Sequence, residues 1–300
     1  MKKFRDLIVD KIEEASVLLI GLPYDKGCSV GTGAKFAPDN LRKLSYHLPP
    51  YSMNGKSLDK IKIFDFGNIE SCKNYHDVVY KKLSSIYSYN KFLLFIGGDH
   101  SVSIPTQKLF LEYCKANKLE PVIIHLDAHP DICDYYDDSY YSHACTIKRA
   151  IDNGCKTENI NLIGIRGYEK QEVEYLNVHK EIKVFNASFI NENGFDNILE
   201  YLINKYNNPN YLIYLSYDID INDPSFAPGT GTPEAFGINS YDLICFIKKL
   251  FSNLNIGAMD LVEISPKLDN NNITSWLGLK SLYEIFEILS EVKNKWNIQC

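Results

Sequence analysis

The segment Pro121-Val-Ile-Ile-His-Leu-Asp-Ala-His-Pro-Asp131 joins a short apolar run to three potential metal ligands. The apolar part, rich in β-branched residues, is typical of a buried strand. Asp127, His129 and Asp131 follow at every second position, and on an extended backbone such residues project to one face. Because neighbouring carboxylates repel each other, their convergence favours a bound divalent cation. The segment therefore predicts a strand that ends in a metal site.

Seven further apolar runs resemble this strand, and helix-like segments separate most of them. The eight predicted strands are Val17–Ile20, Ile61–Phe66, Phe92–Ile96, Val122–Leu126, Asn161–Ile165, Ile182–Phe185, Tyr211–Tyr217 and Ile256–Val262. The predicted helices are His76–Tyr87, Ile104–Ala116, Thr146–Asn153, Phe195–Tyr206, Ser240–Asn253 and Ser275–Trp296. This alternation predicts an α/β fold with a parallel sheet covered on both faces. No Pro/Ser-rich linker divides the chain, so a single domain over residues 1–300 is expected.

Composition excludes several classes of protein. The net charge is −6 and no Lys/Arg cluster stands out, which argues against nucleic-acid binding. The N-terminus lacks the apolar region of a signal peptide, and no run approaches the roughly 18 apolar residues of a membrane span. The eight cysteines form no C-x-x-C pair, so a zinc knuckle is not expected. We expect a soluble, cytoplasmic protein with reduced thiols.

Four motifs lie at the carboxyl ends of predicted strands, where open α/β sheets bind ligands. They are Gly97-Gly-Asp-His-Ser101, Asp127-Ala-His-Pro-Asp131, Ser216-Tyr-Asp-Ile-Asp220 and Asp260-Leu-Val-Glu-Ile-Ser-Pro266. The candidate metal ligands are His100, Asp127, His129, Asp131, Asp218 and Asp220. A lone Asp-x-Asp is usually a loop or a helix cap, but six such ligands exceed the needs of one ion. Two ions that share carboxylates account for them, and an oxygen-rich set without thiolate suits Mn²⁺ better than structural zinc.

These motifs, followed by Asp223-Pro-Ser-Phe-Ala-Pro-Gly-Thr-Gly-Thr-Pro233, resemble the ureohydrolase family of arginases and agmatinases. The resemblance extends from about Gly21 to the C-terminus and includes the opening segment Gly21–Pro38. It implies a three-layer α/β/α fold around a mostly parallel eight-stranded sheet, and a centre of two Mn²⁺ ions. The opening segment departs from the family where Gly31 and Thr32 replace a stretch that contains arginine in many relatives.

The resemblance also implies how the ligands are shared. One ion would be held by His100, Asp127, Asp131 and Asp218. The other would be held by His129, Asp127, Asp218 and Asp220. Asp127 and Asp218 would then bridge the two ions, which would activate water as the nucleophile by lowering its pKa.

Five residues outside this set are assigned roles. Glu263 matches the family's guanidinium-binding carboxylate, which pairs with the substrate through charge-assisted hydrogen bonds. His143 matches the proton-shuttle histidine, and Thr232 matches a position near the attacked group. Asp99 is expected to support the ligands without binding metal. His125 is expected to be a packed or supporting histidine. If Glu263 has no catalytic role, the simplest alternative is a solvated carboxylate at a strand end. The corresponding alternative for His143 is a histidine in a loop or at a helix cap.

The loop Ile132–Ser142 is the candidate binding site for the substrate tail, and Asp134 is its first acidic residue. This loop has three Asp, four Tyr and no Lys or Arg. Such a surface suits a terminal ammonium better than a carboxylate, unless Arg149 or Arg166 reaches the pocket. The loop's ending also resembles agmatinases. The expected substrate is therefore a small cationic guanidine, and the expected reaction is agmatine plus water to putrescine and urea.

Several alternatives stay open on the sequence alone. Guanidinobutyrase, formimidoylglutamase or arginase activity would use the same metal centre on a different tail. A catalytically silent metal-binding regulatory protein is the non-enzyme alternative, which intact Glu263 and His143 disfavour. A dinuclear phosphoesterase would need basic phosphate-binding residues or a glycine-rich loop that cradles phosphate. The pair Gly97-Gly98 is only a weak match to such a loop. A homo-oligomer, trimer or hexamer, is implied only by the resemblance.

Overall fold

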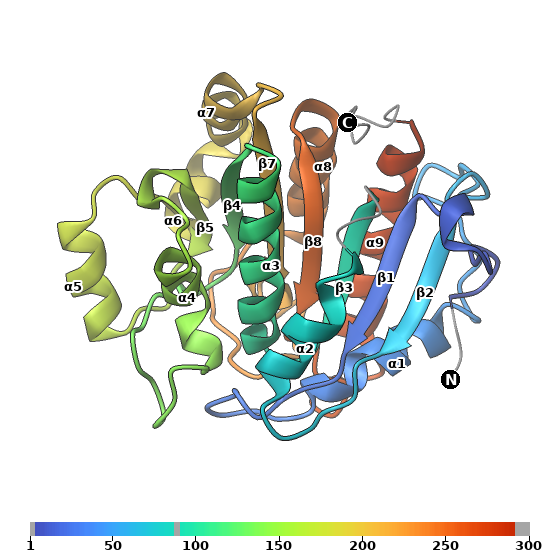
Figure 1. The fold of residues 1–300 in the computed structure, drawn as a ribbon, viewed down its shortest axis with the longest axis horizontal. Helices are drawn as coiled ribbons and strands as arrows, with labels where there is room; N and C mark the ends of the chain where they lie inside the picture. Colours follow the sequence, from blue (N-terminus) through green and yellow to red (C-terminus); the bar gives the residue numbers. More distant parts are fainter. Residues whose placement is uncertain (1–3, 87–90, 292–300) are drawn as a thin grey trace.

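The computed structural model describes residues 4–86 and 91–291, and its centre is one eight-stranded sheet (Figure 1). The strands are β1 Val17–Leu22, β2 Ile63–Asn68, β3 Phe92–Gly97, β4 Glu120–Leu126, β5 Ile160–Ile165, β6 Lys183–Asn186, β7 Tyr211–Asp218 and β8 Ile256–Val262. Their order across the sheet is β2-β1-β3-β8-β7-β4-β5-β6, and every neighbouring pair is parallel. The α/β class is confirmed, and the sheet is wholly rather than mostly parallel.

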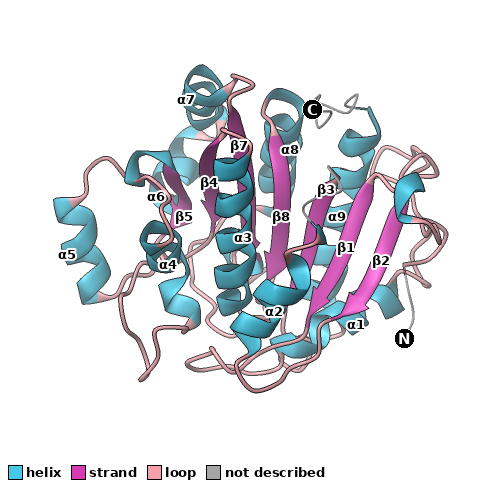
Figure 2. Ribbon diagram, viewed as in Figure 1, coloured by secondary structure: helices cyan, strands magenta, loops and turns pink. Residues whose placement is uncertain are grey.

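Helices cover both faces of the sheet (Figure 2). They are α1 Ala37–Leu44, α2 Tyr75–Leu83, α3 Ser103–Ala116, α4 Thr146–Asp152, α5 Lys170–Val178, α6 Ala187–Asn193, α7 Asp196–Tyr206, α8 Ser240–Asn253 and α9 Ile273–Glu291. Apolar residues of α1, α6, α7, α8 and α9 form one core with one face of the strands. Residues of α2, α3 and α4 form a second core with the other face. Alternate residues of one strand enter different cores: Leu94 and Ile96 face the first, Leu93 and Phe95 the second. This is the expected three-layer arrangement.

All eight predicted strands are present, because continuous apolar runs report burial on both faces. Among the helices, α1, α5 and α6 were not predicted. Pro38 in the first turn of α1 reads as a turn signal, although proline is well tolerated there. In α5 only Glu172 is buried, so the helix lacks an apolar stripe. The ends of two predicted helices, residue 87 and residues 292–296, lie outside the described residues.

The strand order fixes where a ligand can bind. β3, β8, β7 and β4 are the four central strands, and their carboxyl ends lie along one edge. Helices occupy both faces, so this edge is where the loops are free to form a cavity. None of the helices in the described ranges is both long and apolar enough to span a bilayer.

Candidate metal centre

The predicted motifs gather at the carboxyl ends of the four central strands. His100 follows β3, Glu263 follows β8, Asp218 ends β7, and Asp127 follows β4. Because these parallel strands are neighbours, residues far apart in the chain meet at one edge of the sheet.

His100 lies at the middle of a first cluster of buried side chains. Its Nδ1 is 3.0 Å from Oδ2 of Asp127, 3.1 Å from Oδ2 of Asp131 and 3.0 Å from Oδ2 of Asp218. The imidazole thus faces three carboxylates at nearly equal distances. The structure thus brings together the four residues that were predicted to share one ion.

A hydrogen-bond chain behind His100 fixes its tautomer. The Ser216 hydroxyl donates to Oδ1 of Asp260 at 2.8 Å, so its oxygen is left to accept from Nε2–H of His100, also at 2.8 Å. In the neutral ring Nδ1 of His100 then carries the lone pair, and this atom has no hydrogen-bond partner among the described residues. An imidazole oriented through its other nitrogen in this way is typical of a metal ligand.

A second cluster adjoins the first through Asp127. His129 Nδ1 lies 3.2 Å from Oδ2 of Asp220 and 3.5 Å from Oδ1 of Asp127. Asp127 therefore presents one oxygen to His100 and the other to His129, as a bridging carboxylate would. The second predicted bridge, Asp218, turns Oδ2 to the first cluster, while its Oδ1 accepts the backbone N–H of Asp220 at 2.8 Å.

The local backbone differs from the predicted extended strand. β4 ends at Leu126, the next three residues form a bend, and Asp131 adopts a φ of 50°. Asp127 and Asp131 consequently reach the first cluster, while His129 turns to the second. The three side chains serve one site because the chain bends, and not because alternate residues share one face of a strand. The predicted extended backbone over residues 127–131 was therefore wrong.

The charges in these clusters call for cations. Asp127, Asp131, Asp218 and Asp220 are buried, and within the described chain their ion pairs are with histidines only. Burial raises the pKa of Asp218 well above its ordinary value, and the charges of Asp220 and Asp127 raise it further. Among the residues that the structure describes, Oδ2 of Asp127 also has no hydrogen-bond partner. Four carboxylates and two imidazoles arranged in this way suit two divalent ions.

His125 lies closer to the metal ligands than a packing role requires. Its Nε2 is 3.0 Å from Oδ2 of Asp127, and its ring stacks on that of His100 at 4.9 Å between centroids. The same nitrogen is 3.2 Å from the carbonyl oxygen of His129. This places His125 within the first ligand group, where it can hold the Asp127 carboxylate and the bend after β4 in position.

Glu263 and His143 form a pair beside the first cluster. Oε1 of Glu263 accepts the backbone N–H of His100 at 2.8 Å and lies 3.3 Å from Nδ1 of His143. Burial opposes a charge on His143, but the hydrogen bond and charge of Glu263, with the charges of Asp131 and Asp99, raise its pKa to about 9. Glu263 thus favours the protonated form of His143.

Asp99 supports the surrounding loops and contacts no imidazole of the clusters. Its carboxylate accepts the backbone N–H of Gly27 at 2.7 Å and that of Ser101 at 2.9 Å. It is fully buried, and burial together with the charge of Glu263 raises its pKa to about 7. This geometry agrees with a supporting role.

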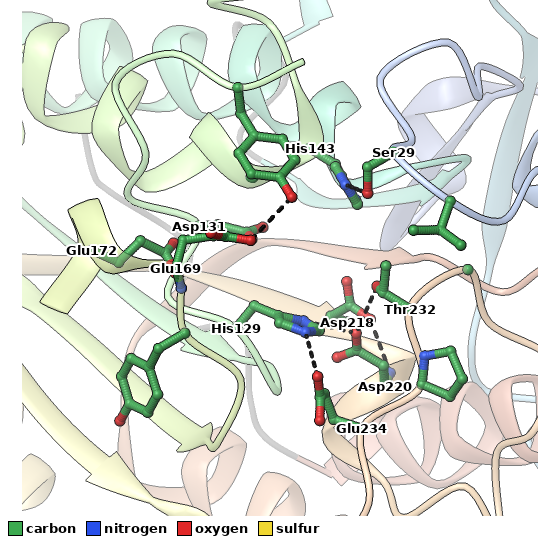
Figure 3. Close-up of a pocket in the computed structure, with 16 residues that line it drawn as sticks. Ser29, His129, Asp131, His143, Glu169, Glu172, Asp218, Asp220, Thr232 and Glu234 are labelled. Carbon is green, nitrogen blue, oxygen red and sulfur yellow. Dashed lines mark hydrogen bonds and ion pairs between the residues drawn. The ribbon is translucent and has the colours of Figure 1, made fainter.

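A cavity of about 380 Å³ opens above the clusters (Figure 3). Its lining residues are Ser29, Val30, His129, Asp131, Tyr136, His143, Ala144, Tyr168, Glu169, Glu172, Asp218, Asp220, Gly231, Thr232, Pro233 and Glu234. Thr232 Oγ1 lies 3.5 Å from Oδ2 of Asp220, beside the second cluster. The lining includes both carboxylates and aromatic rings but no lysine or arginine.

Asp134 does not line this cavity. Its side chain is 62 % exposed and pairs with Arg149, whose side chain also contacts Asp152. Arg166 donates to the backbone carbonyls of Asp220 and Glu234, so it supports the loops and is absent from the lining. Neither Arg149 nor Arg166 therefore contributes a positive charge to the cavity lining.

Several lining residues were not predicted from the sequence, among them three glutamates and one serine. Glu169 and Glu172 belong to the segment that begins α5, Glu234 follows Thr232, and Ser29 lies in the loop after β1. Their side chains enter the site from three separate segments of the chain. The Glu-x-x-Glu spacing of a capping box at 169–172 was the only available sequence signal, and it points to a helix start.

Comparison with known proteins agrees with this geometry. The sequence profile of the Arginase family matches residues 15–287. An agmatinase of Bacillus cereus is 33 % identical over 280 residues, which are 91 % of each chain. A guanidinobutyrase of Pseudomonas aeruginosa is 27 % identical over 94 % of this chain and 89 % of its own. The crystal structure of agmatine ureohydrolase of Thermoplasma volcanium superimposes with a TM-score of 0.83, at 31 % identity, over 97 % of this chain and 94 % of that one.

The chain therefore belongs to the arginase family, whose members are binuclear metal enzymes. Within that family it is a ureohydrolase, a hydrolase of carbon–nitrogen bonds in guanidino groups. The resemblance inferred from the four motifs and the arginase-like fold are both confirmed.

Proposed function

We propose that this enzyme hydrolyses agmatine to putrescine and urea with two Mn²⁺ ions. The observation that carries the proposal is the charge of the cavity lining. Glu169, Glu172 and Glu234 border the space above the metal clusters, and no lysine or arginine joins them. The relatives named agmatinase support the same substrate.

The acidic lining discriminates between guanidine substrates by their tails. Agmatine ends in an ammonium, which gains from nearby carboxylates and aromatic rings. Arginine and guanidinobutyrate end in a carboxylate, which would be repelled. Tyr136 donates to Oε1 of Glu169 at 3.1 Å and keeps that carboxylate beside the cavity. Both oxygens of Glu172 accept backbone N–H groups, from Ile132 and Glu169. Glu169 and Glu234, whose Oε1 lies 3.8 Å from Nε2 of His129, remain as partners for an ammonium.

The two ions would be held by the residues of the two clusters. His100, Asp127, Asp131 and Asp218 would hold one, and His129, Asp127, Asp218 and Asp220 the other. Oxygen-rich sets that contain histidine and no thiolate favour Mn²⁺ over structural zinc. When bound, such ions lower the pKa of water toward about 7 and so supply a nucleophile near neutral pH.

The remaining steps belong to side chains. Glu263 would hold the guanidinium planar through charge-assisted hydrogen bonds, since its carboxylate is buried beside the first cluster. His143 would donate a proton to the nitrogen that leaves as the carbon–nitrogen bond breaks. Thr232, whose Oγ1 lies 3.5 Å from Oδ2 of Asp220, would contact the reacting group.

We also propose a single-domain, cytoplasmic enzyme that assembles as a homo-oligomer, a trimer or hexamer. The seven cysteines in the described ranges are free, in agreement with a reducing compartment, and Cys300 lies outside those ranges. Light scattering coupled to size-exclusion chromatography measures the assembly directly. A monomer at micromolar concentration would contradict it.

A substrate panel tests the proposed reaction. Protein loaded with Mn²⁺ is assayed with agmatine, arginine, guanidinobutyrate and formimidoylglutamate, and again after chelation. We expect the highest kcat/KM for agmatine, and loss of turnover in the chelated sample until Mn²⁺ is returned. Faster turnover of a substrate with a carboxylate tail would refute the agmatine assignment while leaving the enzyme class intact.

A further inference from the structure

His143 has a partner at each ring nitrogen, and only one of them belongs to the predicted site. Nδ1 faces Glu263, while Nε2 lies 3.0 Å from the hydroxyl of Ser29 (Figure 3). Ser29 lines the cavity, comes from the loop after β1, and contacts none of the metal clusters' side chains in the described structure. Its hydroxyl is the part of that loop that contacts His143's ring.

The loop that carries Ser29 is fixed on several sides. The backbone N–H of Gly27 donates to buried Asp99, and the carbonyl of Gly27 accepts the backbone N–H of His143 at 3.1 Å. Farther along, Gly31 packs so closely on Gly231 that an added Cβ would lie 2.8 Å from that residue's Cα. The backbone of His143 and the loop beside its ring are therefore held together. The position of the Ser29 hydroxyl follows from this backbone.

Substrate binding makes the Ser29 contact more important. Glu263 is the proposed partner of the substrate guanidinium, and the same Oε1 faces Nδ1 of His143. A guanidinium with several donors competes for that carboxylate, which weakens the hydrogen bond at Nδ1 at the moment of reaction. The contact at Nε2 does not face this competition. Ser29 is then the partner that holds the imidazole ring.

We propose that Ser29 is a positioning residue that keeps the His143 ring aligned for proton donation; this rests on the proposed role of His143. A hydroxyl both donates and accepts, so it can accept from protonated Nε2 before the transfer and serve either tautomer of the neutral ring afterwards. The ring can thus keep one orientation through a turnover. An alanine at this position removes both capacities.

The charged groups around His143 set the expected pH behaviour. Glu263 faces it from the end of β8, Asp131 from the bend after β4, and Asp99 from the end of β3. On the loop after β1 the nearby thiol of Cys28 stays neutral, because burial raises its pKa. Loss of the Ser29 hydroxyl removes an acceptor for the charged ring, so His143 should lose its proton at lower pH.

Ser29→Ala, Ser29→Thr and His143→Gln, alone and combined, test the proposal in Mn²⁺-loaded enzyme. The assay uses agmatine, or the panel substrate with the highest kcat/KM if that is another guanidine. We expect Ser29→Ala to lower kcat about ten-fold, as for one lost hydrogen bond, with KM and Mn²⁺ content unchanged. In Ser29→Ala the alkaline limb of the pH–kcat profile should move to lower pH. Ser29→Thr should recover most of the rate. Ser84→Ala, which removes an exposed hydroxyl bonded to the carbonyl of Lys81, is the matched control.

The combined variant separates the possible outcomes. We expect His143→Gln to lower kcat about 100-fold or more, and Ser29→Ala to add nothing in that background. Additive losses, or an unshifted alkaline limb, would overturn the positioning role of Ser29. An unchanged rate in Ser29→Ala beside a slow His143→Gln would do the same and leave the proposed mechanism standing. An unchanged rate in His143→Gln would remove the proposed shuttle and this inference with it.

Discussion

Two groups of buried carboxylates in this molecule are neutralised in opposite ways. On α9, Glu284 and Glu287 are buried, and Lys248 of α8 lies 2.9 Å and 2.6 Å from them. At the metal centre, carboxylates such as Asp127 and Asp218 form ion pairs only with histidines within the described chain. The first group carries its own counter-charge and ties two helices together. The second group lacks one, which is what a site for external cations requires.

The sharpest way to break this comparison is to remove one charge from each group. We expect Asp218→Asn to lower kcat/KM by several orders of magnitude and to reduce bound Mn²⁺, because it removes a ligand of the first cluster. Glu287→Gln removes the same charge from the lysine-neutralised group and should leave turnover unchanged. Metal content by mass spectrometry and urea release measure the two effects. Full activity in Asp218→Asn would contradict the proposed ligand set.

The complementary test removes the positive charge of Lys248 instead of a carboxylate. Lys248→Met leaves Glu284 and Glu287 buried without their main partner, and we expect a loss of about 3 kcal/mol in the free energy of unfolding. Denaturant titration measures it. The matched control is Lys249→Met, whose side chain is 53 % exposed and pairs with exposed Asp196. An equal loss in both variants would show that burial does not distinguish them.

The ion pair between Lys248 and Glu287 also predicts that stability falls at acidic pH. Lys248 holds the pKa of Glu287 below its ordinary value against the opposing effect of burial, so folding gains stability above the unfolded pKa. That gain is lost as the pH falls through the folded pKa, in the range below about 4.5. In Lys248→Met the folded pKa of Glu287 should rise, because burial is no longer offset by Lys248. As the pH falls, the stability that Glu287 contributes should then be lost at a higher pH than in the native chain. Unfolding curves at a series of acidic pH values measure the difference from the native chain.

Mn²⁺ should stabilise the folded protein by binding the carboxylates of the metal centre, and not those that Lys248 neutralises. At a Mn²⁺ concentration 100 times Kd, linkage predicts a gain of about 2.7 kcal/mol per ion in the free energy of unfolding. Calorimetry with and without Mn²⁺ measures the shift in Tm. Lys248→Met should show the same shift as the native chain, since its lesion lies elsewhere. A shift that vanished in Asp218→Asn but persisted in Lys248→Met would sharpen the comparison further.

The smallest expected effect concerns the cavity rim. The double substitution Glu169→Gln with Glu234→Gln should raise KM for agmatine up to roughly five-fold, because partly exposed charge pairs contribute little each. It should also narrow the preference over guanidinobutyrate. Glu174→Gln, which removes one exposed acid on α5 outside the cavity, is the control for each of the two single substitutions. A preference unchanged by the double substitution would mean that the rim carboxylates do not select the substrate.

Local sequence predicted the parts of the molecule that depend on local burial. Each strand appeared as an apolar run, and the ligands of β4 and β7 appeared as clustered Asp and His residues. α5 was missed because only one of its side chains is buried. Ser29 and Glu234 were missed because they become part of the site only through loops that meet in three dimensions. The pairing of Asp134 with Arg149 was invisible for the same reason.

The backbone of Glu263 has a consequence for the evolution and engineering of this enzyme. Its φ of 63° lies in the left-handed region, where a residue with a side chain costs about 1 kcal/mol or more. Glycine would relieve that cost, and yet it would remove the carboxylate beside the reacting centre. Selection for heat resistance alone would therefore favour replacement of Glu263, and selection for turnover would restore it. Stability and activity compete at a single torsion angle.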